Sequence, residues 1–222
     1  MVILGIDVIS DIVCAWCYIG KRRLDRAIAL YRKTYPGGRD DVFQITWRPY
    51  YLDYNTSSPD SIEKSELAEK KLAGMRPEQR TALTQRMSQL GRSVGINFKW
   101  GGRIGSTRDA HRLIHLSQTK SEDITNALVE KLFEAYHELE RDISSRELLF
   151  EIAVDAGLDA SEVEEYLNGS GSSTVDEEAQ KNKETFGSVP VFIIQGIRRL
   201  EGAQESTDFM EIFAQVKDSG SS

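Results

Sequence analysis

The cysteines of the chain are Cys14 and Cys17, which stand three residues apart in the segment Cys14-Ala15-Trp16-Cys17. A cysteine thiolate attacks disulfides, and a second thiol nearby can resolve the mixed disulfide that results. Two cysteines are too few for a secreted scaffold held by several disulfides, so redox chemistry, metal ligation and plain packing remain as interpretations. The spacing predicts Cys14 as the attacking thiol and Cys17 as the resolving thiol.

The elements around this pair predict that Cys14 lies where a strand gives way to a helix. Residues 2–9 are an apolar, β-branched run typical of a buried strand. The 3.6-residue period of an amphipathic helix then appears at Leu24, Ala27, Ile28 and Tyr31. At a helix start, unpaired backbone N–H groups and the helix dipole favour a thiolate. Positive charge nearby comes from Lys21, Arg22 and Arg23, although such residues more often form a solvated helix face.

Strand patterns recur on both sides of a long helical block. Residues 42–47 alternate as a second strand, and residues 61–186 read as helical with no convincing strand pattern. Strand character returns at 189–194, where Gln195-Gly196 predicts a tight turn before a returning strand and a closing helix. The order βαβ, helices, ββα predicts an α/β fold with a large all-helical insertion.

This order predicts the domain organisation. Residues 1–60 and 187–218 are expected to form one discontinuous domain, and residues 61–186 are expected to form the inserted helical domain. Residues 219–222 are expected to be a flexible tail.

Charge and hydropathy limit the classes of partner. The formal net charge of −7 lowers the expectation of nucleic-acid binding, which usually needs a basic field. No apolar run is long enough to span a bilayer, and the N-terminal residues lack a basic leader segment. We therefore expect a cytoplasmic protein that acts on proteins or small molecules, with no nucleic-acid or membrane partner.

The segment from Asp11 to Lys21 resembles the active-site segment of the FrnE group of DsbA-like thioredoxin-fold proteins. Proline commonly stands in that group where this chain has Ala15. Further matching stretches occur in the same order along the chain: Trp47-Arg48-Pro49-Tyr50, Asp109-Ala110-His111-Arg112-Leu113, Gly187-Ser188-Val189-Pro190-Val191-Phe192 and Gly202-Ala203-Gln204. The resemblance implies a thioredoxin fold interrupted by a helical insertion, and the activity of a protein disulfide oxidoreductase.

The resemblance also implies a substrate-binding loop. The proline corresponding to Pro190 is cis in that family, and the backbone at Val189 receives a substrate strand beside the redox pair. Trp16 and Asp11 are the further substrate-binding candidates, although Asp11 is equally well read as a turn residue. Because residues between the cysteines tune redox poise, Ala15 leaves the direction of electron flow open. The substrates are expected to be protein or small-molecule disulfides; no cofactor is required, and glutathione is open as a co-substrate.

Three alternatives stay open. Cys14, Cys17, His111 and His115 have the ligand types of a zinc site, although we expect no metal, with His111 packed between insertion and core and His115 on a helix surface. Kappa-class glutathione transferases and 2-hydroxychromene-2-carboxylate isomerases resemble this chain but carry serine at the position of Cys14, so a glutathione-dependent isomerase or transferase is a second alternative. A peptide-binding chaperone that uses the same groove is the third.

Overall fold

The computed structural model describes residues 1–52, 61–169 and 172–219. Within these residues a four-stranded sheet has the order β2-β1-β5-β6. Its strands are β1 (Ile3–Ser10), β2 (Val42–Pro49), β5 (Val191–Ile194) and β6 (Arg198–Glu201). Strands β1 and β2 are parallel, whereas β5 pairs antiparallel with both β1 and β6. This sheet and its helices confirm the predicted thioredoxin fold with a helical insertion.

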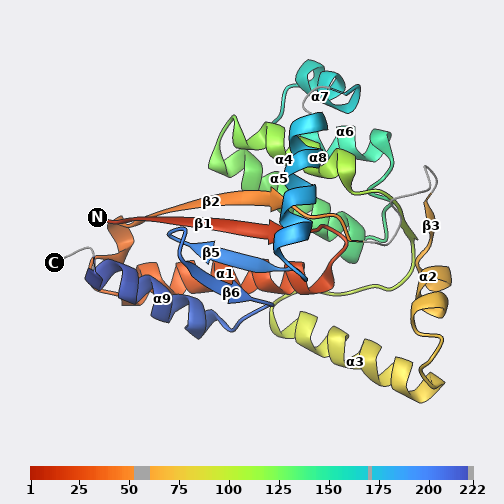
Figure 1. Cartoon of the computed structure of the whole chain (residues 1–222), viewed down its shortest axis with the longest axis horizontal. Coiled ribbons are helices and arrows are strands. Elements are labelled where there is room, and N and C mark those ends of the chain that lie inside the picture. The colour runs from red at the N-terminus through yellow and green to blue at the C-terminus, as the bar shows by residue number, and fades with distance from the viewer. Residues whose placement is uncertain (53–60, 170–171, 220–222) are drawn as a thin grey trace.

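Helices cover both faces of this sheet (Figure 1). Helices α1 (Ala15–Thr34) and α9 (Ser206–Ser219) pack against each other along one face. The opposite side carries α4 (Arg108–Gln118), α5 (Glu122–His137), α6 (Arg146–Asp155), α7 (Ala160–Leu167) and α8 (Ser172–Thr185). Away from the sheet lie α2 (Lys64–Lys71) and α3 (Pro77–Ser93), and a short helical turn, η1 (Gly38–Asp40), links α1 to β2.

The expectation of an uninterrupted helical block between residues 61 and 186 is wrong at one place. Strands β3 (Ile62–Glu63) and β4 (Arg103–Ile104) form a small antiparallel sheet. Two residues are too few to show an alternating pattern, so the sequence gives no sign of either strand. Glycine makes their approach possible: Gly102 has a φ of +82°, and its carbonyl accepts a hydrogen bond from the backbone N–H of Lys64.

Several element boundaries differ from the predicted ones. Helix α8 begins at Ser172, and residues 170–171 before it lie outside the described part. Ser219 is the last residue of α9 rather than the start of a tail, and residues 220–222 of that predicted tail lie outside the described part. The predicted boundary at residue 60 also falls outside it, so the division into 1–60, 61–186 and 187–218 stays a prediction.

The predicted turn between the last two strands is confirmed. Gln195 and Gly196 both have positive φ angles, +55° and +71°, as the tight turns that join antiparallel strands require. In the described part of the chain, no helix is long and apolar enough to cross a membrane.

Candidate active site

Cys14 is the N-cap residue of α1 and half-buried, at the junction with the loop that follows β1. Its backbone is extended, with φ −87° and ψ 112°, and its carbonyl accepts the first bonds of the helix from the N–H groups of Cys17 and Tyr18. The first turn of α1 carries no acidic residue. The sulfur therefore lies at the positive end of an uncompensated helix dipole, as the sequence predicts.

Cys17 lies one turn further along α1 and is only 2% exposed. Burial raises the pKa of its thiol well above the ordinary value, and the neighbouring Cys14 thiol, which interacts with it directly, raises it further. Both cysteines are free thiols in this structure. The two sulfurs are thus adjacent but unequal, since one is accessible and the other is covered and held protonated.

The loop before β5 lies beside Cys14. The Cys14 thiol donates to the Val189 carbonyl at 3.7 Å, and the Val189-Pro190 peptide bond is cis, as the resemblance implies. The register between β1 and β5 ends at the pair Ile9 and Val191, so Val189 stands outside the strand ladder. Its backbone is therefore placed to meet an added extended segment.

Gly20, one turn after the cysteine pair on α1, lets this loop approach the helix. A Cβ at position 20 would lie 2.9 Å from the Phe192 ring and 3.2 Å from the Pro190 ring. Phe192 is fully buried and packs edge-on against Phe209, so it has little room to move. Close packing between α1 and β5 thus depends on the absence of a side chain at position 20.

The basic second turn of α1 is not a solvated face, which corrects that expectation. The Lys21 side chain is 7% exposed and contacts Glu130 and Asp25, each at 2.7 Å. Arg22 contacts the same Glu130 at 2.6 Å, whereas Arg23 is buried and reaches Glu205. Carboxylates on α1 itself and on distant segments offset these cations, which leaves the N-terminus of α1 as the positive potential beside Cys14.

Glu130, on α5, was missed by the sequence analysis. Burial raises the pKa of its carboxyl, but the cations Lys21 and Arg22 outweigh burial and hold the pKa below its usual range. Its partners stand far away in the sequence, and a glutamate in an amphipathic helix is by itself an ordinary surface residue. No pattern in the sequence could have identified it.

Asp11 belongs to the turn that leads into Cys14. Its backbone carbonyl accepts from the Cys14 N–H at 3.1 Å, and its side chain, in a residue 1% exposed, accepts from the Leu52 N–H at 2.8 Å. The second carboxylate oxygen lies 3.5 Å from Nε2 of His111. In this structure the carboxylate is an internal contact of the loop, with no exposed surface for a substrate.

The two histidines considered for zinc are held separately from the cysteines. His111 is 5% exposed and packs beside Asp11 and Tyr51, as expected of a residue between insertion and core. His115, which was expected on a helix surface, is half-buried on α4. Within residues 1–52, 61–169 and 172–219, no three His, Cys, Asp or Glu side chains gather as a metal site would require.

Trp16 is the exposed member of the predicted site. It lies in the first turn of α1 between the cysteines and is 41% exposed. An exposed indole beside a half-buried thiol offers an apolar surface to a bound chain.

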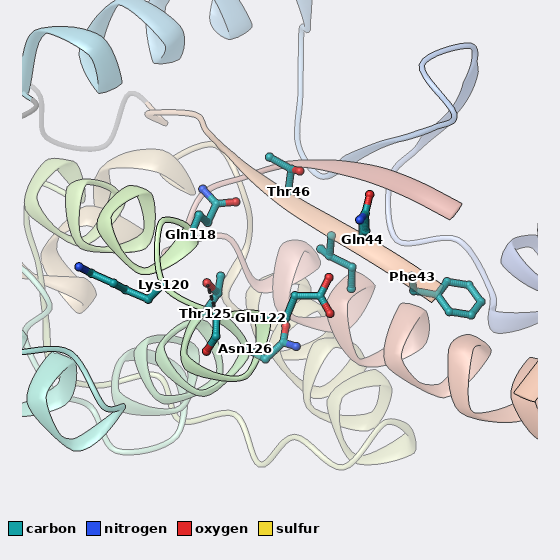
Figure 2. Close-up of a pocket in the computed structure, with 10 residues that line it drawn as sticks. Phe43, Gln44, Thr46, Gln118, Lys120, Glu122, Thr125 and Asn126 are labelled. Carbon is teal, nitrogen blue, oxygen red and sulfur yellow. Dashed lines mark hydrogen bonds between the residues drawn. The ribbon is translucent and has the colours of Figure 1, made fainter. Parts of the chain in front are cut away.

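A cavity of about 460 Å³ lies elsewhere, along the free edge of β2 (Figure 2). Phe43, Gln44 and Thr46 of β2 line it, together with Lys120 of the α4–α5 connection and Glu122 at the start of α5. Neither cysteine and no residue of the Val189-Pro190 loop lines it. This cavity is therefore separate from the predicted redox site.

Comparison with known proteins places the chain in a family. The model of the DSBA-like thioredoxin domain matches residues 5–214. A probable DsbA oxidoreductase from Streptomyces coelicolor superposes with a TM-score of 0.81 at 27% identity, covering 96% of this chain and 89% of that chain. No curated protein matches the sequence.

More distant structures share the fold. The cytosolic disulfide reductase DsbM from Pseudomonas aeruginosa, solved with GSH, gives a TM-score of 0.60 at 15% identity over 96% of this chain and 98% of that one. A 2-hydroxychromene-2-carboxylate isomerase gives 0.66 at 14% identity, with 98% of each chain covered. Since the family model matches almost the whole chain, the protein belongs to the DSBA-like thioredoxin domain family.

Proposed function

We propose that the protein is a thiol–disulfide oxidoreductase, of the FrnE group within its family, that works through Cys14 and Cys17. The observation that carries this proposal is the asymmetry of the pair. Cys14 is half-buried at the N-cap of α1 beside the Val189 carbonyl, whereas Cys17 is buried behind it. Exchange chemistry needs an accessible attacking thiolate and a nearby second thiol, and this arrangement supplies both.

In the first step the Cys14 thiolate attacks one sulfur of a substrate disulfide. A bond forms between Cys14 and that sulfur, the substrate S–S bond breaks, and the second substrate sulfur leaves as a thiolate that takes up a proton. The helix N-terminus stabilises the negative charge on Cys14 before attack. The product is a mixed disulfide between protein and substrate.

In the second step Cys17 loses its proton and attacks the Cys14 sulfur. The Cys14–Cys17 bond forms, the mixed disulfide breaks, and the first substrate sulfur leaves as a thiol. Two electrons pass from the cysteine pair to the substrate, and the reverse sequence oxidises a dithiol. Because burial raises the pKa of Cys17, its proton is retained until the mixed disulfide has formed.

The substrate is proposed to be a protein disulfide or a small disulfide such as that of glutathione. The Val189 backbone lies outside the sheet ladder and can pair with an extended segment, and Trp16 offers an apolar contact on the other side of Cys14. Glutathione is the proposed recycling reductant, supported by the GSH-bound structure of the P. aeruginosa relative. A cytoplasmic location is proposed on the same basis, since that relative is described as cytosolic.

A double variant separates this proposal from its alternatives. Reduction of a small aromatic disulfide with reduced glutathione as electron donor is measured for the wild type and for Cys14→Ala/Cys17→Ala. Exchange predicts turnover by the wild type and background rates for the variant. Equal turnover by both proteins contradicts it and favours glutathione chemistry independent of the thiols; equal binding of an unfolded peptide, with no turnover by either protein, favours a chaperone.

A further inference from the structure

The loop between β1 and Cys14 touches the helical insertion at a histidine that has no place in the exchange steps. We propose that His137 is a positioning residue for Cys14: its Nε2–H donates to the Ile12 carbonyl and fixes the loop that delivers Cys14 to the start of α1. This inference rests on the proposed function. The distance between His137 Nε2 and the Ile12 oxygen is 2.9 Å.

The imidazole is held by aromatic rings on several sides. Its ring centroid lies 5.7 Å from that of Tyr18, 6.1 Å from that of Phe133 and 4.8 Å from that of Tyr136. The residue is 5% exposed and ends α5. The ring therefore has one orientation, with Nε2 directed at the Ile12 carbonyl.

The chemistry of the contact defines which ring nitrogen carries a hydrogen. A carbonyl oxygen only accepts hydrogen bonds, so Nε2 must carry the hydrogen. Burial lowers the pKa of His137 to about 3, and the nearby Lys64 ammonium acts in the same direction. The imidazole is thus a neutral donor at every pH at which disulfide exchange proceeds, and it adds no charge near the cysteines.

The hydrogen bond from His137 matters because of how the other carbonyls of the loop are held. The backbone carbonyl of Ser10 accepts from Tyr50, and that of Asp11 accepts from Cys14. Both donors belong to segments next to the sheet, whereas the next carbonyl along the loop, that of Ile12, accepts from a side chain of α5. Ile12 is 1% exposed, so its carbonyl has no access to solvent as a replacement partner.

Removal of the donor should therefore move the loop rather than leave it in place. A buried carbonyl without a partner is costly, and a change at Ile12 is transmitted over one residue to Cys14. Cys14 then loses its alignment with the N-terminus of α1 and with the Val189 carbonyl. The expected consequence is a slower attack by Cys14.

Two substitutions distinguish hydrogen bonding from packing. His137→Phe keeps an aromatic ring in the stack and removes the donor, whereas His137→Gln keeps a donor near the position of Nε2 and removes the ring. Each is made in the Cys17→Ser background, and the second-order rate of Cys14 with a small aromatic disulfide is measured together with the unfolding midpoint. We expect His137→Phe to slow the reaction about tenfold and His137→Gln to keep most of the parent rate. This order of rates should hold even if His137→Gln has the lower unfolding midpoint.

Val129→Ala is the matched control. Val129 is fully buried on the same helix, two turns before His137, and its truncation should lower stability while the hydrogen bond from His137 to Ile12 is kept. It should leave the rate unchanged. The inference is overturned if His137→Phe reacts like the parent, or if His137→Gln is the slower variant. If the Cys17→Ser parent itself fails to react, the proposed function is wrong, which is a separate result.

Discussion

The sheet-forming part of the chain and its helical part contribute to the site in different ways. The sulfurs proposed to react and the backbone proposed to face the substrate come from the start of α1 and from Val189, beside the ends of β1 and β5. Helices α4 and α5 contribute polar side chains that contact the same region: His111 and His137, which are buried, and Glu130, which is half-buried. In the proposed mechanism the first part carries out the chemistry, and the second part fixes its geometry and charge. Changes in the first part should therefore abolish exchange, and changes in the second should weaken it.

The largest effect is expected for Cys14→Ser. Serine is a good N-cap residue, so the fold should be retained, whereas the attacking thiolate is lost. Exchange with a small disulfide should fall to the background rate in both directions, and the unfolding midpoint should change little. Preserved exchange in this variant would place the attacking group elsewhere.

Gly20→Ala tests how tightly α1 packs on the sheet. The new Cβ would lie 2.9 Å from the buried Phe192 ring, so we expect a loss of about 1–3 kcal/mol in the free energy of unfolding. Denaturant titration measures it. Gly74→Ala is the control, since nothing lies within 4 Å of the added Cβ, and it should be nearly neutral. Equal effects of the two substitutions would contradict the close packing described here.

Glu130→Gln tests the charge that the helical part supplies. Removal of the carboxylate leaves Asp25 as the only carboxylate beside the buried Lys21 in the described part of the chain. It should lower the free energy of unfolding by about 1–3 kcal/mol near neutral pH. The pKa of Glu130 in the folded protein lies below the ordinary pKa of a glutamate. Its contribution to the free energy of unfolding is therefore fully present above the ordinary pKa and is lost as the pH falls through the folded pKa. The difference in the free energy of unfolding between Glu130→Gln and the wild type should therefore become smaller at acidic pH. Glu66→Gln, in an exposed pair with Lys70, should leave the free energy of unfolding nearly unchanged.

The smallest expected effect is a pH dependence assigned to His137. Its folded pKa is lowered to about 3, so between that value and its ordinary one the unfolded chain binds the proton and the folded protein does not. Stability therefore falls as the pH falls, by about 1 kcal/mol from about pH 7 to about pH 5.5. Denaturant titrations at both pH values should show this loss in the wild type and about 1 kcal/mol less in His137→Gln. An identical pH dependence in the two proteins would show that His137 is not the group responsible.

The sequence predicts the parts of the site that are local along the chain. Each of these parts has a signal within a few residues: the apolar strand before Cys14, the helical periodicity after Cys14 and the turn at Gln195-Gly196. The structure confirms all of these elements. The environment of Lys21 and Arg23 could not be predicted, because the side chains that bury them come from distant segments.

Other features had no signal because their cause lies across the fold. His137 ends a helix whose apolar face is evident, but its partner is a backbone carbonyl, and any residue carries one. Gly20 could be read as an ordinary helical glycine until the Pro190 loop was placed against it. Strands of two residues, such as β3 and β4, are fixed by their pairing and have no periodic pattern.

The most direct test of the central claim is intact-mass measurement of the two single cysteine variants after mixing with glutathione disulfide. The account predicts that Cys17→Ser gains one glutathionyl group, held at Cys14 and released by excess reductant, because the resolving thiol is missing. Cys14→Ser should stay unmodified, since its remaining thiol is 2% exposed and held protonated by burial. An adduct on Cys14→Ser, or none on Cys17→Ser, would contradict the assignment of Cys14 as the attacking thiol and Cys17 as the resolving one.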